Sequence, residues 1–185
     1  MKGTKKMNSQ NKTIKLAKMG MLVAISVVLV YLVHFPIFPP VAFLEYDPAD
    51  IPIFIGTFAF GPLAGILLVT VTAIIQGTTV SAASGLYGII MHILATGSFV
   101  LVAGLIYRGH KSRGKAVVAL AAGVATMTVM MVIANLIVTP YFMGVPVSVV
   151  KGLLPYIIAF NLLKAGVNSI ITFLLYKRLS GFLHK

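Results

Sequence analysis

The chain has 185 residues, no cysteine and only three acidic side chains. Without cysteine it has no thiol nucleophile, no disulfide bond and no thiolate metal ligand. A Walker-type glycine loop and an H-E-x-x-H motif are also missing, and Ser81 and Ser84 lack a recognisable His/Asp relay. His34 and His92 are far apart and have no acidic partner in the apolar segments, so we interpret both as structural. We therefore expect no enzyme, no metal site and no ATPase activity in this chain.

Polar residues are scarce, since 59% of the chain is hydrophobic and its mean hydropathy is +1.02. A soluble domain of this size does not need so much apolar surface, so the composition predicts an all-α integral membrane protein in the lipid bilayer. No stretch remains for a second, soluble domain, and we expect residues 1–185 to form a single membrane domain. The apolar run at about 19–35 follows a basic segment, as in a signal peptide. It is long and no A-x-A site follows it, so we interpret it as a retained helix.

The net charge of +12 is concentrated in three clusters beside the apolar runs, at residues 1–18, 108–115 and 177–185. Basic residues accumulate on the cytoplasmic side of membrane proteins, so we expect all three clusters, and hence both termini, to be cytoplasmic. The three acids all fall within residues 45–50 and are expected outside. This placement indicates membrane topology and not a nucleic-acid-binding surface.

Helix breakers divide the apolar sequence into six predicted transmembrane helices. They are expected at about 19–35, 51–59, 63–78, 86–107, 116–138 and 153–176. An even number of crossings must separate the N-terminal and central basic clusters, which assigns three helices to the uncharged segment 51–107. The helix at 51–59 is too short to span alone, so it either starts earlier or is sheltered by its neighbours. Outer loops, both containing prolines, are expected at about 36–50 and 139–152.

The last apolar run contains a single charged residue, Lys164. An ionisable side chain in a membrane helix is costly and by default faces the protein interior, where it serves function. Asn161, Lys164 and Asn168 share one helical face because they are spaced i, i+3 and i+7. Two interpretations follow, a polar wall that binds a ligand or a clamp that bonds neighbouring helices.

Further polar and aromatic residues are expected near this face, in the outer half of the membrane. Lys164 is predicted about ten residues, or roughly 15 Å, from the outer end of its helix, and Asn135 lies near the outer end of the preceding one. The outer loops supply candidate lid residues over a ligand, namely Leu44, Glu45, Tyr46, Asp47 and Phe142. For Phe142 an interfacial aromatic belt is the alternative. Asp50 is interpreted either as a helix cap or as a partner of the ligand or of Lys164.

The first helix carries a stripe of small residues, Ala17, Gly20 and Ala24, near its cytoplasmic end. Small residues at this spacing let another helix approach closely. The stripe is therefore a candidate docking surface for a partner protein, with packing inside this chain as the alternative.

Two stretches are similar to a known family, residues 43–52 (FLEYDPADIP, with D-x-x-D-I-P) and residues 60–65 (FGPLAG). Together with the order of six short helices, they resemble the substrate-binding (S) subunits of energy-coupling factor (ECF) vitamin transporters, and most closely those that transport riboflavin. The resemblance covers essentially the whole chain. It implies a protein of the bacterial cytoplasmic membrane that captures riboflavin outside and needs no cofactor.

The resemblance also implies partners and site residues. A transmembrane coupling subunit and two cytoplasmic ATPases would drive release inside, and the coupling subunit would dock on the small-residue stripe. The family motif at that stripe is A-x-x-x-A, in whose place Gly20-x-x-x-Ala24 stands here. The vitamin would lie under the first outer loop, against the fourth to sixth helices. Asn161 and Lys164 match polar positions of that wall, whereas Asn135 and the loop residues correspond less directly.

Riboflavin is neutral, so a buried Lys164 needs another explanation for its charge. Either Glu45, Asp47 or Asp50 pairs with the lysine, or desolvation leaves it uncharged. An anionic vitamin such as pantothenate or folate would explain the lysine directly, so ligand identity stays open at this point. A stand-alone membrane carrier is a further alternative, disfavoured because the two halves of the chain show no strong sign of inverted repeats.

Overall fold

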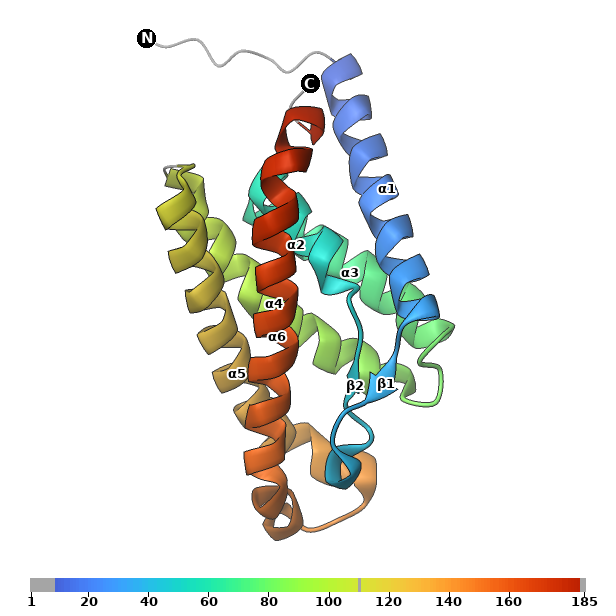
Figure 1. The fold of residues 1–185 in the computed structure, drawn as a ribbon. Helices are drawn as coiled ribbons and strands as arrows, with labels where there is room; N and C mark the ends of the chain where they lie inside the picture. Colours follow the sequence, from blue (N-terminus) through green and yellow to red (C-terminus); the bar gives the residue numbers. More distant parts are fainter. Residues whose placement is uncertain (1–8, 110, 184–185) are drawn as a thin grey trace, which may run out of the picture.

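The structure is a computed structural model that describes residues 9–109 and 111–183. These residues form six α-helices, one 3-10 helix and a two-stranded antiparallel sheet. In chain order the elements are α1 (Ser9–Leu32), β1 (Phe35–Pro36), η1 (Pro39–Val41), β2 (Glu45–Tyr46), α2 (Asp50–Phe60), α3 (Pro62–Thr78), α4 (Gly85–Gly109), α5 (Arg113–Met143) and α6 (Val147–Leu183) (Figure 1). The predicted helical class is confirmed, because each strand has only two residues and both belong to the α1–α2 connection.

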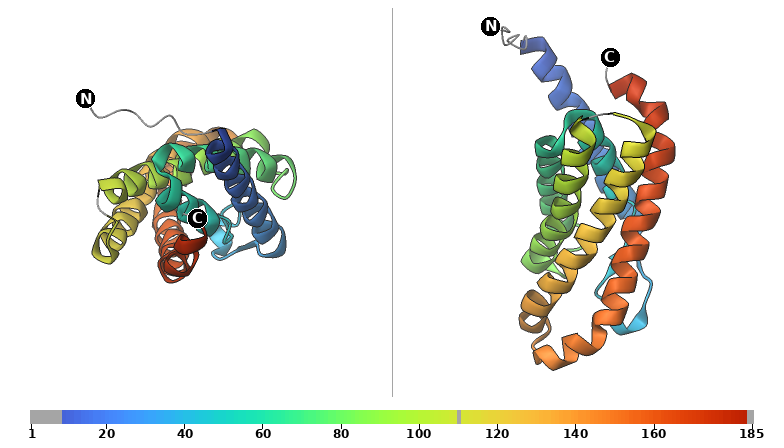
Figure 2. Two further views of the ribbon diagram at one scale, coloured as in Figure 1. Left: turned by 90° about the horizontal axis from the view of Figure 1, so that it is seen from above. Right: turned by 90° about the vertical axis from the view of Figure 1, so that its left-hand side faces the viewer.

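Successive helices run in alternating directions, which separates the two kinds of charge. The start of α1, the α4–α5 connection and the end of α6 share one end of the molecule, whereas the β1–β2 sheet and the α5–α6 connection lie toward the other (Figures 1 and 2). The basic residues at 12–18 and 108–115 therefore lie at the first end, and the acids at 45–50 lie away from it. Lys2, Lys5, Lys6 and Lys185 lie outside the described residues. Helices α1, α4, α5 and α6 are long and apolar enough to cross a membrane.

Helix α2 is short, and it is shielded as the sequence required. All of its residues from Asp50 to Phe58 are buried, and it packs against α1, α3, α4 and α6. Phe54 of α2 stacks on Phe99 of α4, with ring centroids 3.8 Å apart and an interplanar angle of 7°. The ring of Phe99 also lies close to Gly123 of α5, where an added Cβ would come within 2.8 Å of ring atoms. A helix of this length survives in the bilayer because protein, not lipid, surrounds it.

The prediction of a long loop at about 139–152 is wrong. Helix α5 continues to Met143 and α6 begins at Val147, with Pro140 and Pro155 inside the two helices. The actual stop is Gly144, whose φ of 64° is left-handed and whose N–H donates to the carbonyl of Pro140. Glycine in this conformation is a common helix end, whereas proline is tolerated within membrane helices. Lys164 therefore lies about five turns into α6, deeper than predicted.

Helix α1 also begins earlier than predicted, at Ser9 instead of about residue 19. The added turns carry Lys12, Lys15 and Lys18, which the sequence analysis assigned to the basic segment before the first apolar run. Lysine is a good helix former, and a helix that emerges from the apolar layer can continue in water. The beginning of the apolar run therefore does not mark the beginning of the helix.

Candidate functional site

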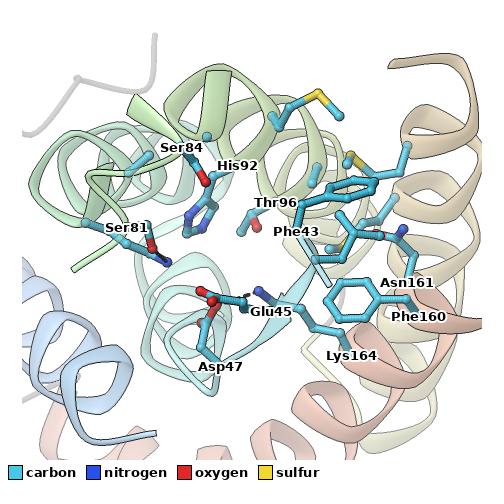
Figure 3. Close-up of a pocket in the computed structure, with 18 residues that line it drawn as sticks. Phe43, Glu45, Asp47, Ser81, Ser84, His92, Thr96, Phe160, Asn161 and Lys164 are labelled. Atoms are coloured by element: carbon cyan, nitrogen blue, oxygen red, sulfur yellow. Dashed lines mark hydrogen bonds and ion pairs between the residues drawn. The ribbon is translucent and has the colours of Figure 1, made fainter. Parts of the chain in front are cut away.

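A cavity of about 130 Å³ lies between the α1–α2 connection and helices α3, α4, α5 and α6 (Figure 3). Its larger apolar lining residues are aromatic or flexible, namely Phe43, Leu44, Met91, Met127, Met131 and Phe160. Its polar lining residues are Glu45, Asp47, Gln76, Ser81, Ser84, His92, Thr96, Asn161 and Lys164. A concave site that combines aromatic and apolar side chains with convergent polar groups is typical of a small-molecule site.

Lys164 and Asp47 form the central ion pair of this site. Lys164 Nζ donates to Asp47 Oδ2 at 2.7 Å, and the two side chains are 12% and 3% exposed. Of the three acids that the sequence offered as partners, the structure selects Asp47. The pair joins the α1–α2 connection to α6 across 117 positions of sequence. Because a buried charge without a partner is strongly destabilising, this contact ties the loop to the helix behind the cavity.

Asn168 holds the same loop from one turn further along α6. Its Nδ2 donates to the carbonyl oxygen of Asp47 at 3.1 Å, and its Oδ1 accepts from the hydroxyl of Tyr46 at 3.1 Å. Burial raises the pKa of the Tyr46 hydroxyl, and the adjacent Asp47 carboxylate raises it further. The hydroxyl therefore keeps its proton and acts as a hydrogen-bond donor. The face predicted on α6 therefore divides into two parts. Asn161 and Lys164 line the cavity, and Asn168 is the clamp that fixes its cover.

The cap expected of Asp50 is not formed, and Asp50 makes no hydrogen bond or ion pair with Lys164, although the two charges interact electrostatically. Asp47 Oδ1 accepts from the backbone N–H of Ala49, the residue just before α2, at 3.0 Å. Asp50 is fully buried and its Oδ1 accepts from Thr96 Oγ1 at 2.8 Å. It also lies 3.3 Å from His92 Nε2, within ion-pair distance but without the alignment of a hydrogen bond. The expectation that His92 has no acidic partner is therefore wrong, because α2 brings one from 42 positions away.

Other predicted site residues lie around the cavity and do not all line it. Leu44 and Glu45 line it, and Tyr46 acts through Asn168. Phe142 lines a smaller neighbouring cavity of about 60 Å³, which shares Phe43 and Leu44 with the first.

Asn135 is fully buried but its amide is used within α5. Its Nδ2 donates to the carbonyl of Met131 at 2.8 Å, and its Oδ1 accepts from Thr139 Oγ1 at 2.8 Å. Asn135 does not line the main cavity, although Met131 does. His34, expected to be structural, lies at the end of α1 with its Nδ1 3.0 Å from the carbonyl oxygen of Val30.

Sequence reasoning missed the polar side chains that α3, α4 and their connection bring to the cavity. Gln76, His92 and Thr96 line it, as do Ser81 and Ser84, which were considered only as nucleophiles. A signal was available, because Gln76 is the one amide and His92 the one histidine in the uncharged segment 51–107. Polar groups in apolar surroundings are costly unless paired, so each of them needed a reason.

The small-residue stripe of α1 faces away from the bundle. Ala17, Gly20 and Ala24 are all exposed, and a Cβ added to Gly20 would meet no atom within 4 Å. The buried residues of the same helix, Met19, Leu22, Ser26 and Val30, lie on its opposite face. The alternative that the stripe packs inside this chain is thereby excluded.

Comparison with known proteins places this chain in a family. A profile of the ECF transporter substrate-specific component matches residues 14–176. The Riboflavin transporter RibU of Staphylococcus aureus (strain TCH60) is 32% identical, over 100% of both chains. The Riboflavin transporter FmnP of Bacillus subtilis (strain 168) is 30% identical, over 94% of this chain and 96% of that protein. A solved structure described as the S component of a bacterial ECF transporter has a TM-score of 0.80 and 34% identity, covering 96% of this chain and 100% of its own. The chain is thus a multi-pass membrane protein that belongs to the substrate-specific components of ECF transporters.

Proposed function

We propose that this chain captures riboflavin in the cavity beneath the α1–α2 connection, as the substrate-binding subunit of an ECF importer. The observation that carries the proposal is a cavity whose cover is fixed to α6 by the Lys164–Asp47 pair, with Asn161 beside it. The two relatives named as riboflavin transporters match it over nearly its full length, so the whole fold and not one motif supports the assignment.

The chemistry of the lining suits a flat, neutral ring with one polar edge. Phe43 and Phe160 lie on the side of Asn161 and Lys164 in Figure 3, and the methionines complete the apolar surface. Aromatic and Met side chains pack against planar apolar ligands, and the Asn161 amide and the Lys164 ammonium offer hydrogen bonds to a pyrimidine edge. Because Asp47 already neutralises Lys164, the site does not need an anionic ligand. This removes the main argument for pantothenate or folate.

Ligand entry is expected to move the loop. The cavity of about 130 Å³ is smaller than the roughly 300–1,000 Å³ of typical small-molecule sites. Phe43 and Leu44 separate it from the neighbouring cavity of about 60 Å³ that Phe142 lines. Displacing these two side chains would join the two spaces, which gives Leu44 and Phe142 the roles predicted from the sequence.

We further propose that all six helices cross the cytoplasmic membrane of a bacterium, with both termini inside and the site open to the outside. The segregation of basic and acidic residues between the two ends of the bundle supports this orientation. The exposed stripe of Ala17, Gly20 and Ala24 would dock the transmembrane coupling subunit, which works with two cytoplasmic ATPases. The chain itself is then a binding subunit without catalysis or a cofactor.

The test is spectroscopic. The chain is purified in mild detergent, its absorption and flavin fluorescence are recorded, and riboflavin is titrated against it. Saturable quenching of flavin fluorescence supports the proposal, and Asn161→Ala and Lys164→Ala should each weaken binding about tenfold or more. Lys151→Ala is the matched control, because Lys151 is an exposed lysine on the same helix. Unchanged riboflavin fluorescence with the wild-type chain would reject riboflavin and move the search to anionic vitamins.

A further inference from the structure

A second cavity, of about 400 Å³, lies at the end of the bundle that carries the basic residues. It is found where α2 ends and α3 begins, beside the start of α1 and the end of α4, and away from the β1–β2 sheet (Figure 1). Three of its lining residues are cations, namely Lys15 of α1, Arg108 of α4 and Lys111 of the α4–α5 connection, and the others are apolar or neutral. We refer to this space as the basic cavity.

No carboxylate side chain balances the three cations of the basic cavity. The chain has only three acids, and all of them lie within residues 45–50, at or before the start of α2. The basic cavity lies at the other end of that helix, which has 11 residues and is therefore about 16 Å long. Two of the acids are also in contact with Lys164 and His92. The charge of the basic cavity is therefore suited to an anion that comes from outside the chain.

The packing of α1 directs Lys15 toward the basic cavity. Lys15 is half-buried and shares a helical face with Met19 and Leu22, which are both buried in the bundle. Its Nζ lies 5.7 Å from the ring centroid of Phe60, which also lines the cavity. A cation–π contact orients an ammonium group without neutralising it. Lys15 is thus placed by the bundle, on the face of α1 opposite the small-residue stripe.

The surface beside the basic cavity is apolar, as expected of a surface that faces lipid. Leu63 lines the cavity and is nevertheless 82% exposed. Exposed apolar side chains continue from it along one face of α3, at Leu63, Leu67, Val71 and Ile74. On α4, Leu101 and Leu105 are also exposed, and they share a helical face with Arg108. A molecule that combines an anionic group with apolar chains matches this surface.

We infer that the basic cavity binds the phosphate headgroup of an anionic phospholipid, whose acyl chains lie along the exposed faces of α3 and α4. Phosphate oxygens accept hydrogen bonds from the Arg108 guanidinium in a bidentate manner and from the lysine ammonium groups as point charges. Basic pockets between membrane helices on the cytoplasmic side are suited to such headgroups, and the proposed orientation puts this cavity there. The bound lipid would join α1 to the end of α4. The inference depends on a membrane location and not on flavin capture, because the two cavities share no lining residue.

The experiment counts the lipids that the chain retains in mild detergent, by native mass spectrometry. Phosphatidylglycerol is titrated, and phosphatidylcholine with the same acyl chains is the zwitterionic comparison. The test variant is Lys15→Gln with Arg108→Gln. Its matched control is Lys12→Gln with Arg113→Gln, which removes the same two kinds of exposed or half-buried cation outside the cavity lining. The wild-type chain should prefer one phosphatidylglycerol, and the test variant should weaken it about thirtyfold, or about fivefold for each cation removed.

The control variant should weaken phosphatidylglycerol by less than about threefold. Equal losses in the test and control variants would overturn the inference, because binding would then depend on net charge and not on the cavity. Equal wild-type affinity for the two lipids would overturn it as well. Inorganic phosphate at millimolar concentration should leave the lipid bound, and displacement would assign the cavity to a soluble phosphate instead of a lipid.

Thermal unfolding of the lipid-free variants in detergent is the folding control. Where the test variant fails to fold, Lys111→Gln replaces it, with an expected loss of about fivefold. An unchanged affinity in a folded Lys111→Gln would then overturn the inference. Failure of the proposed function is a separate result, since it is read from riboflavin titration of the wild-type chain.

Discussion

Replacing Asp47 with asparagine isolates the charge of the pair that holds the loop. Asparagine has almost the same shape, and its Oδ1 can still accept from the N–H of Ala49, so the start of α2 keeps its hydrogen bond. What changes is the environment of Lys164, whose ammonium loses the carboxylate 2.7 Å away while its side chain stays 12% exposed. The variant therefore leaves a buried charge without its counter-ion.

The expected cost follows from that burial. Removing one member of a buried ion pair costs roughly 3–5 kcal/mol, whereas an exposed pair contributes about 0.2–1 kcal/mol. The pair here is nearly buried and keeps some access to water, so we expect about 3 kcal/mol less stability for Asp47→Asn. If the closed loop is the form that binds, riboflavin affinity falls by about 100-fold for the same reason. Replacing both partners, Asp47→Asn with Lys164→Met, should recover most of the stability but not the affinity, because the ammonium donor is gone.

The assay is a double-mutant cycle on the free energy of unfolding in detergent, run beside riboflavin titrations of the same four proteins. A coupling energy of about 2 kcal/mol or more between Asp47 and Lys164 is expected. Glu45→Gln is the control, because Glu45 is an exposed carboxylate in the same loop, and it should change stability by less than about 0.5 kcal/mol. A measured coupling below about 0.5 kcal/mol would refute the reasoning, since the pair would then behave as a solvated one.

Three further predictions test the packing, the partner surface and the orientation. Gly123→Val should destabilise the chain by about 1–3 kcal/mol, because its side chain would collide with the ring of Phe99, as unfolding in detergent would reveal. Gly20→Val points into open space, so stability and riboflavin binding should be unchanged while co-purification with the coupling subunit is lost; retained co-purification would exclude the stripe. Because the chain has no cysteine, single cysteines report topology directly. Ala42→Cys should react with a membrane-impermeant maleimide on intact cells, whereas Lys111→Cys should react only after permeabilisation. The reverse labelling pattern would show that the chain has the opposite orientation in the membrane.

Local sequence signals predicted the helix boundaries correctly where a glycine in a left-handed conformation and a proline occur together. The Phe-Gly-Pro junction at residues 60–62 separated α2 from α3 correctly, because Gly61 has a φ of 96° and Pro62 opens the next helix. The same logic was wrong at Pro140, which α5 accommodates internally. A proline removes one hydrogen bond, but in a bundle the neighbouring helices compensate, whereas a left-handed glycine such as Gly144 ends the helix itself. Composition therefore located the helices, and tertiary packing determined which prolines and glycines end a helix.

The sequence predicted which residues of α6 share one face, but not which residues of the loop each of them contacts. The period of α6 put Asn161, Lys164 and Asn168 on one face, and the structure has all three facing the loop side of the bundle. Helical spacing cannot distinguish a side chain that lines the cavity from one that clamps its cover. That distinction depends on contacts such as Tyr46 with Asn168, which are 122 positions apart.

Asp47 shows why these long-range contacts matter for function. One carboxylate oxygen accepts from Ala49 at the start of α2, and the other accepts from Lys164 in the wall of the cavity. Asp47 therefore links the loop, the residue that precedes the buried helix and the charged side chain in the cavity wall. A ligand that displaces Phe43 and Leu44 pulls on the same loop, and so acts on the pair that closes it. Binding and loop order are then coupled through Asp47, which is why the affinity loss in Asp47→Asn should follow its loss of stability.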